Sequence, residues 1–139
     1  MNPEKAELVR IRIANAKATL REVEVYQIEN ELWNTAVNRL YYACLYAVTA
    51  LLHNHGYDTK THSGVQNNFG HYFIKTGIFS KETGKFFAKL FKMRQNADYE
   101  DLLIYEKEEV LPLIPQAREL ISQVCLILEV EDERTRYGA

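Results

Sequence analysis

Apolar residues recur at helical spacing along almost the whole chain, and turn-forming or polar residues separate the apolar segments. Five helices are predicted, over residues 2–28, 31–55, 65–76, 80–94 and about 110–130. No alternating strand pattern and no sequence repeat interrupts them. We therefore predict an all-α fold, a single-domain up-and-down bundle of four to five helices that occupies residues 1–130.

Residues with special backbone preferences mark the predicted helix ends. Asn2 precedes Pro3 and begins the first helix, and Ser80 begins the fourth. Gly56 ends the second helix and Gly77 ends the third, because glycine takes the left-handed conformation with the least strain. Two prolines at positions 112 and 115 delay the regular part of the last helix to about residue 110.

The second helix carries small residues on one side. Ala36, Ala43, Ala47 and Ala50 fall in one narrow sector at about 100° per residue. Large apolar residues cover the neighbouring sectors, so this helix has no wide polar face. We predict that it lies in the centre of the bundle, with another backbone packed closely against the alanines.

The remaining sector of this helix is polar and aromatic, with Arg39, Tyr42 and Tyr46 at its centre. An arginine here needs a partner, because an unpaired buried charge is costly. One interpretation is an ion pair and tyrosine hydrogen bonds that hold the helices in register. The other is a pocket wall, in which a tyrosine stacks on a base and Arg39 binds a phosphate.

Arg94 continues the apolar stripe of the fourth helix, because Phe87, Leu90 and Phe91 precede it by seven, four and three residues. One interpretation is that Arg94 interacts with the carbonyl groups at the helix end and with Asp98. The other is that Arg94 borders a cleft.

Composition adds limits to this picture. The chain has 139 residues and a formal net charge of −2, with basic and acidic residues mixed, so any contact with nucleic acid should be local. The charged N-terminus lacks the apolar core of a signal peptide, and no uninterrupted apolar run reaches about 18 residues. We expect a cytoplasmic protein with no membrane contact and with a charged, flexible tail over residues 131–139.

Cysteine and histidine positions favour neither a disulfide nor a metal site. Cys44 and Cys125 lie in apolar helical surroundings and are expected to be buried thiols. His53 and His55 point to nearly opposite sides of a helix, and the usual zinc-ligand spacings are absent. No metal and no cofactor is predicted. His62 either borders a cleft or caps a helix that begins at Ser63.

Four short motifs in a fixed order resemble the HEPN (higher eukaryotes and prokaryotes nucleotide-binding) domain family. They are NRLYYACLYAVTALL at 38–52, THSGV at 61–65, KTG at 75–77 and RQNADYED at 94–101. The resemblance extends over about residues 5–128 and is to small stand-alone prokaryotic members with an Arg-x-x-Ala-Asp-Tyr motif. It implies a helical bundle, usually a homodimer or higher homo-oligomer, that often acts with a minimal nucleotidyltransferase.

Many members of this family are metal-independent ribonucleases and toxins, in which an arginine and a histidine a few residues later meet at the dimer cleft. Arg94 matches the arginine, but Tyr99 stands where the histidine would fall. Histidine moves protons near neutral pH, whereas tyrosine, with a pKa of about 10, does so poorly. If the protein cleaves RNA, the resemblance gives Arg94, Asp98 and Tyr99 as the catalytic residues.

Three functions follow. The first is a nucleotide- or RNA-binding homo-oligomer with a degenerate ribonuclease site, which acts with a minimal nucleotidyltransferase in a toxin–antitoxin-like pair. The second is an active ribonuclease toxin in which His62 or Asp98 carries protons. The third is a structural bundle without ligand. Residues expected to bind nucleotide or RNA are Arg39, Tyr42, Tyr46, His62, Arg94 and Asn96.

Overall fold

The computed structural model describes residues 3–136, with side chains up to Asp132. Its elements are α1 (Pro3–Glu22), η1 (Val23–Gln27), α2 (Trp33–Asn54), α3 (His62–Phe69), η2 (Gly70–Ile74), α4 (Lys81–Tyr99), α5 (Lys107–Val110) and α6 (Leu113–Arg136). The segments η1 and η2 are single π-helical turns that continue α1 and α3. The predicted all-α fold is confirmed, and the part of the chain that is described contains no strand.

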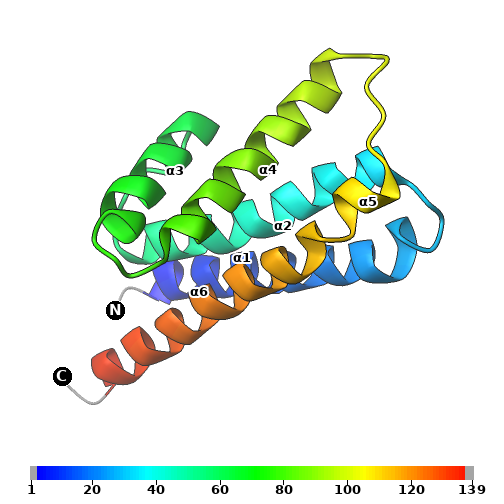
Figure 1. The fold of residues 1–139 in the computed structure, drawn as a ribbon. Helices are drawn as coiled ribbons and strands as arrows, with labels where there is room; N and C mark the ends of the chain where they lie inside the picture. The colour runs from blue at the N-terminus through cyan, green and yellow to red at the C-terminus, as the bar shows by residue number, and fades with distance from the viewer. Residues whose placement is uncertain (1–2, 137–139) are drawn as a thin grey trace.

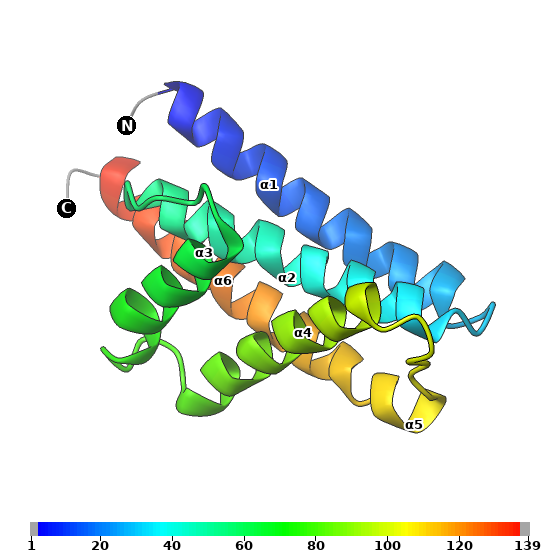
Figure 2. The same ribbon diagram turned by 90° about the horizontal axis from the view of Figure 1, so that it is seen from above.

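The helix α2 is the centre of the molecule. Side by side, α1, α2 and α6 form the long body of the bundle, while α4 rises obliquely across α2 and α3 lies at one end (Figures 1 and 2). All of α1, α3, α4, α5 and α6 contact α2. The alanines at positions 36, 43, 47 and 50 are completely buried, so the small-residue sector allows the close packing that the sequence predicts.

Local sequence signals set several helix ends as predicted. The Oγ of Ser80 accepts a hydrogen bond from the backbone N–H of Thr83 at 3.2 Å, which caps α4. Gly56 and Gly77 have φ angles of +80° and +82°, the left-handed conformation that favours glycine.

The end of the fourth helix differs from the prediction. The sequence predicts that it stops near Arg94, but α4 continues to Tyr99. Residues 95–98 contain neither glycine nor proline, and an ion pair at i, i+4 spacing joins Arg94 to Asp98 across this turn. Asn96 accepts the backbone hydrogen bond from Glu100 that completes the helix.

Other boundaries also differ from the prediction. The third helix begins at His62, three residues early, because the side chain of Thr61 accepts from the Gly64 backbone N–H at 2.9 Å and caps it. The last helix begins at Leu113, after Pro112 interrupts the short helix α5. The boundary expected at residue 130 falls inside α6, which is helical to Arg136; residues 137–139 of the expected tail lie outside the described part.

Residues 107–132 are the one described segment that is long and apolar enough, by length and composition, to cross a membrane. Val110, Leu113, Ala117, Leu120 and Val124 of this segment are nevertheless at most 1% exposed, packed into the bundle. One face of this segment thus packs into the bundle, and a single segment of this kind is weak evidence for a membrane span.

Candidate functional site

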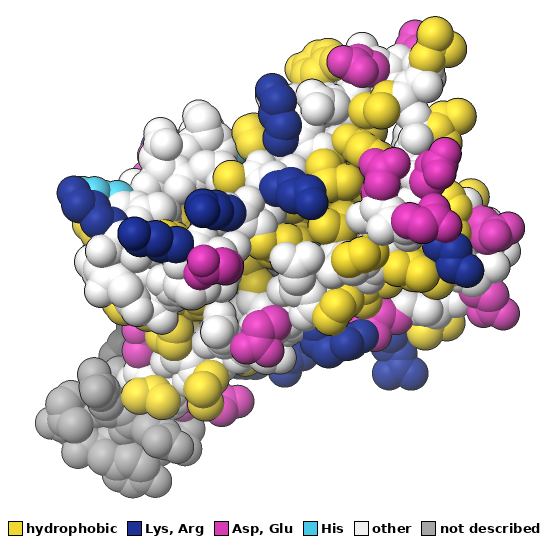
Figure 3. Space-filling view, in the orientation of Figure 1, with side chains coloured by type: hydrophobic (Ala, Val, Ile, Leu, Met, Phe, Trp, Pro, Cys, Tyr) yellow, Lys and Arg dark blue, Asp and Glu magenta, His cyan; other side chains and the backbone are white. Residues whose placement is uncertain are grey.

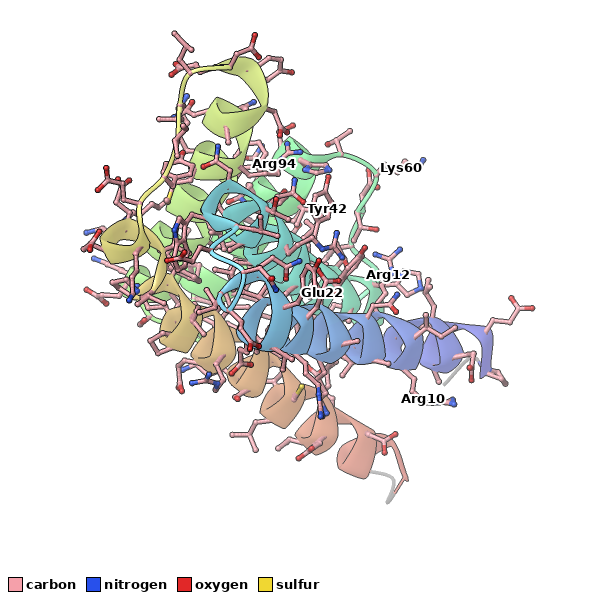
Figure 4. All side chains as sticks on the ribbon, turned by 90° about the vertical axis from the view of Figure 1, so that its right-hand side faces the viewer. Arg10, Arg12, Glu22, Tyr42, Lys60 and Arg94 are labelled. Carbon is pink, nitrogen blue, oxygen red and sulfur yellow. The ribbon has the colours of Figure 1, made fainter. Side chains whose placement is uncertain are left out.

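Three helices bring polar and aromatic side chains together on one side of α2. We define the Arg94 cluster as Tyr41 and Tyr42 of α2, His62 of α3, and Arg94 and Asp98 of α4. Arg94 and Tyr42 lie next to each other, above Glu22 of α1, in Figure 4. The cluster forms because α3 and α4 both pack against the same part of α2.

Arg94 is held by aromatic rings and by one carboxylate. Its guanidinium carbon lies 5.2 Å from the centre of the Tyr41 ring and 5.7 Å from that of Tyr42, within the range of cation–π attraction. Nη1 lies 3.1 Å from the Asp98 carboxylate and 3.4 Å from the Tyr42 hydroxyl. The side chain of Arg94 is only 17% exposed, whereas that of Asp98 is 47% exposed.

The protein does not use all the hydrogen-bonding capacity of this guanidinium. An arginine has five N–H donors. The Nε atom of Arg94 is buried and has no hydrogen-bond partner among the described residues. A partly buried cation with unused donors and one exposed carboxylate partner is suited to exchange that carboxylate for a phosphate.

Tyr41 and His62 form the second half of the cluster. The Tyr41 hydroxyl and His62 Nδ1 lie 2.7 Å apart, and the two rings stack with centroids 5.6 Å apart. The His62 ring also contacts Phe91 of α4. His62 therefore lies in the Arg94 cluster. The alternative interpretation, in which His62 caps the helix, is wrong, because Thr61 is the cap.

The electrostatics of this pair favour neutral forms. Burial lowers the pKa of His62, and the positive charge of Arg94 lowers it further. Burial raises the pKa of Tyr41, although Arg94 offsets part of the rise. A neutral imidazole can accept at Nδ1, which satisfies the buried Tyr41 hydroxyl as donor and leaves the proton of His62 on Nε2.

Two of the predicted binding residues border the cluster. The Tyr46 ring lies 6.3 Å from the Tyr42 ring. Arg39 lies 5.9 Å from the Tyr42 ring and pairs with Glu22 of α1, with 3.7 Å between Nε and the carboxylate. This ion pair is the inter-helix contact that the first interpretation of Arg39 expects.

Asn96 and Tyr99 do not join the cluster. Tyr99 follows Arg94 by five residues in one continuous helix, so it points about 140° away around the axis of α4. Its side chain is 81% exposed. The position where the family's histidine would fall thus lies on a different side of α4 from the Arg94 guanidinium.

Tyr41 is the one member of the Arg94 cluster that the sequence did not point to as a site residue. Tyr41 is completely buried and stands in the apolar part of α2. The available signal was the pair Tyr41–Tyr42 beside an arginine, since a buried tyrosine hydroxyl needs a partner. The distant His62 could not be identified as that partner from spacing alone.

Neither cysteine belongs to the Arg94 cluster, and the possible metal ligands among the described residues lie too far apart to bind one ion. Cys44 is buried, as predicted, whereas Cys125 is only half-buried on α6. Within residues 3–132, no three histidine, cysteine, aspartate or glutamate side chains gather closely enough to hold a metal ion.

Comparisons with known proteins agree with this architecture. The family model described as the HEPN domain matches residues 9–128 of the chain. A UPF0332 protein of Thermotoga maritima is 35% identical over 126 residues, which cover 91% of this chain and 95% of that protein. Two proteins of Methanocaldococcus jannaschii, each named "Putative toxin", are 30% identical over 126 residues (84% of this chain, 93% of that protein) and 38% identical over 80 residues (58% and 54%).

Proposed function

Because this chain belongs to the HEPN domain family, we propose that it is a toxin-like, nucleotide- or RNA-binding member in which the Arg94 cluster binds a phosphate group. In this proposal the protein is a homo-oligomer that acts with a minimal nucleotidyltransferase, and its ribonuclease site is degenerate. The matches to two toxin-named relatives support the toxin-like part of the proposal.

The observation that carries the proposal is the state of Arg94. Its guanidinium is desolvated by two tyrosine rings, has an unpartnered N–H, and is neutralised by a carboxylate that is itself half-exposed. A phosphate oxygen can replace Asp98 without breaking the ring contacts. The resulting charge-assisted hydrogen bonds are stronger than neutral ones.

The residue type at position 99 supports a degenerate site. Proton transfer in metal-free RNA cleavage requires a group near the reacting oxygen that titrates near neutral pH. A tyrosine side chain is a poor proton carrier near neutral pH, and Tyr99 stands where the family's histidine would fall. Binding can therefore persist where cleavage by the family's arginine and histidine is lost.

One observation favours the active ribonuclease as a second candidate. His62 lies in the Arg94 cluster and is neutral; in the tautomer in which its Nδ1–H donates to the Tyr41 hydroxyl, Nε2 is free to accept a proton as a general base. In this version His62 replaces the missing histidine and Arg94 stabilises the charge on phosphorus. Growth arrest on expression of the chain, lost in His62→Ala, would favour this candidate.

The test of the proposed function is Arg94→Ala, measured by titration with ADP and with a short RNA and by thermal melting. Loss of charge-assisted hydrogen bonds should weaken binding by roughly 10- to 100-fold. Arg118→Ala is the matched control, because Arg118 also pairs with a carboxylate, that of Glu24, but joins α6 to η1. Asp98→Asn should strengthen binding by removing the competing carboxylate.

Three results would change the assignment. A parent protein without nucleotide or RNA affinity, together with a strongly destabilised Arg94→Ala, would leave Arg94 with a packing role only. RNA cleavage by the parent that disappears in both Arg94→Ala and His62→Ala would establish the second candidate. Cleavage that appears only in Tyr99→His would identify the missing proton carrier as the reason for inactivity.

A further inference from the structure

The outer side of α4 carries a row of lysines. Lys81, Lys85, Lys89 and Lys92 are all exposed, and their spacing places them within a sector of about 80° around the helix. Dark blue side chains lie over α4 on the face seen in Figure 3. Arg94 points to the opposite side of α4, toward α2, so this row is separate from the Arg94 cluster.

These lysines are not neutralised by the protein. Within the described side chains, none of the four forms an ion pair or a hydrogen bond. Glu82 is the one acidic residue of α4 before Asp98. The row is therefore a concentration of positive charge on a chain whose net charge is −2.

An exposed aromatic ring ends the row. Tyr99 follows Lys81 by eighteen residues, which is five full turns, so it falls in the same sector as the lysines. Its side chain is 81% exposed and free to stack. From Lys81 to Tyr99 the row is about 27 Å long, at about 1.5 Å per residue.

A groove runs beside the first half of the row. It encloses about 490 Å³ between α4 and the α3–η2 segment. Its lining includes Asn67, Gly70, Lys81, Lys85 and Ala88. Two of the lysines thus border a groove whose other wall carries the side chains of Gln66, Asn67 and Ile74, where a phosphate or a ribose has room.

We propose that this face of α4, defined as Lys81, Lys85, Lys89, Lys92 and Tyr99, is a second contact surface for single-stranded RNA. The lysines bind consecutive phosphates without reading sequence, and Tyr99 stacks on a base. The proposal rests on the proposed RNA binding and extends it beyond the Arg94 cluster. The residues beside the row are small or polar: Gly84 and Ala88 lie between the lysines, and Gln95 and Asn96 lie between Lys92 and Tyr99. The face therefore lacks the apolar side chains that a membrane-binding helix buries.

The first test measures how salt affects binding of a fluorescent 20-nucleotide uridine RNA. The double variant Lys85→Gln/Lys89→Gln should reduce the slope of log affinity against log salt by about 1.4, because each phosphate that a lysine no longer neutralises lowers the slope by about 0.7. The double variant Lys17→Gln/Lys107→Gln removes the same charge from exposed lysines of α1 and α5 and is the matched control. Equal slopes for both double variants would overturn the proposal.

The second test separates stacking from charge. Tyr99→Ala should weaken binding of the same RNA by roughly 5- to 150-fold, as expected when one base no longer stacks on an aromatic ring. Tyr99→Phe keeps the ring and should bind within about twofold of the parent. Unchanged RNA affinity of Tyr99→Ala, with an altered sedimentation coefficient, would overturn the proposal and assign Tyr99 to a protein contact with its exposed neighbours Leu102 and Ile104.

The outcomes distinguish this proposal from the proposed function. ADP is too short to reach both surfaces, so Arg94→Ala should weaken ADP binding while the lysine and Tyr99 variants should not. If Arg94→Ala has no effect but the lysine and Tyr99 variants lower RNA affinity, the Arg94 site fails and the α4 surface stands. Binding of the parent to an acidic peptide or to phosphatidylserine vesicles, with no affinity for the RNA, would overturn the α4 surface.

Discussion

At the scale of single residues, Tyr41 and Tyr42 have different environments because neighbours in a helix point about 100° apart. Tyr42 faces Arg94 at the surface of α2, while Tyr41 is buried and bonded to His62. Replacing Tyr41 with Phe keeps the ring contacts but removes the 2.7 Å hydrogen bond. We expect a loss of about 1 kcal/mol in the free energy of unfolding, measured by urea denaturation. Tyr26→Phe, at an exposed tyrosine, should change little.

His62 should make stability depend on pH. Burial and Arg94 lower its pKa in the folded state, so below about pH 6.5 the unfolded chain binds a proton that the folded protein does not. The free energy of unfolding should therefore decrease as the pH falls below about 6.5. Above that pH, His62 is neutral in both states and should not make stability depend on pH. Burial also lowers the pKa of His53, so two groups act in the same direction.

We expect His62→Gln to flatten, but not abolish, the fall in unfolding free energy between pH 7 and pH 5. The exposed His71, changed to Gln, is the matched control. The measurement is urea denaturation at a series of pH values. An identical pH profile in His62→Gln and the parent would mean that His62 is equally basic in the folded and unfolded states.

At the scale of elements, α2 depends on its small residues. Ala43 and Ala47 are completely buried where other helices approach the α2 backbone. Leucine at either position should overpack this contact and destabilise the protein by about 1 to 3 kcal/mol. Ala18→Leu, at an exposed position of α1, is the control. If the two buried variants melt at the same temperature as the control, the helices can move apart at Ala43 and Ala47 without loss of stability.

The connection from α4 to α5 is fixed by one side chain of α2. Asn34 donates from Nδ2 to the Leu103 carbonyl at 2.8 Å and accepts at Oδ1 from the Tyr105 backbone N–H at 2.7 Å. Asn34→Ala should lower stability by about 1 to 2 kcal/mol and speed amide exchange over residues 100–106. Asn30→Ala removes one local bond to Tyr26 and should leave this connection unchanged. Slow exchange in both variants would contradict the assignment.

At the scale of the whole molecule, several large apolar side chains remain exposed. Leu102 is 95% exposed, Ile104 74% and Leu126 62%, and the first two lie close together in the connection between α4 and α5. Together with the family, this supports a homodimer or higher oligomer with a two-fold interface. Sedimentation at micromolar concentration should give at least twice the chain mass of 16.2 kDa. A monomer alone at that concentration would contradict the prediction.

The sequence by itself determined which segments are helical, where most of them begin and end, and which helix is central. Ser80, Gly56 and Gly77 act on backbone groups within a few residues, so their effects can be read without the fold. The alanine sector of α2 likewise depends only on helical periodicity. The sequence also indicated Arg94, Tyr42 and His62 as candidate site residues, each considered separately.

Only the tertiary structure decided which of these residues meet. Tyr41 and His62 are 21 residues apart, and Arg94 and Tyr42 are 52 apart, so no local spacing rule connects them. The sequence also did not show which residues share a side of α4. The helix was predicted to end at Arg94, whereas Tyr99 belongs to the same helix. Packing of α4 against α2 turns Arg94 inward and leaves the lysines and Tyr99 outward. This orientation depends on contacts between distant segments, which local propensities do not contain.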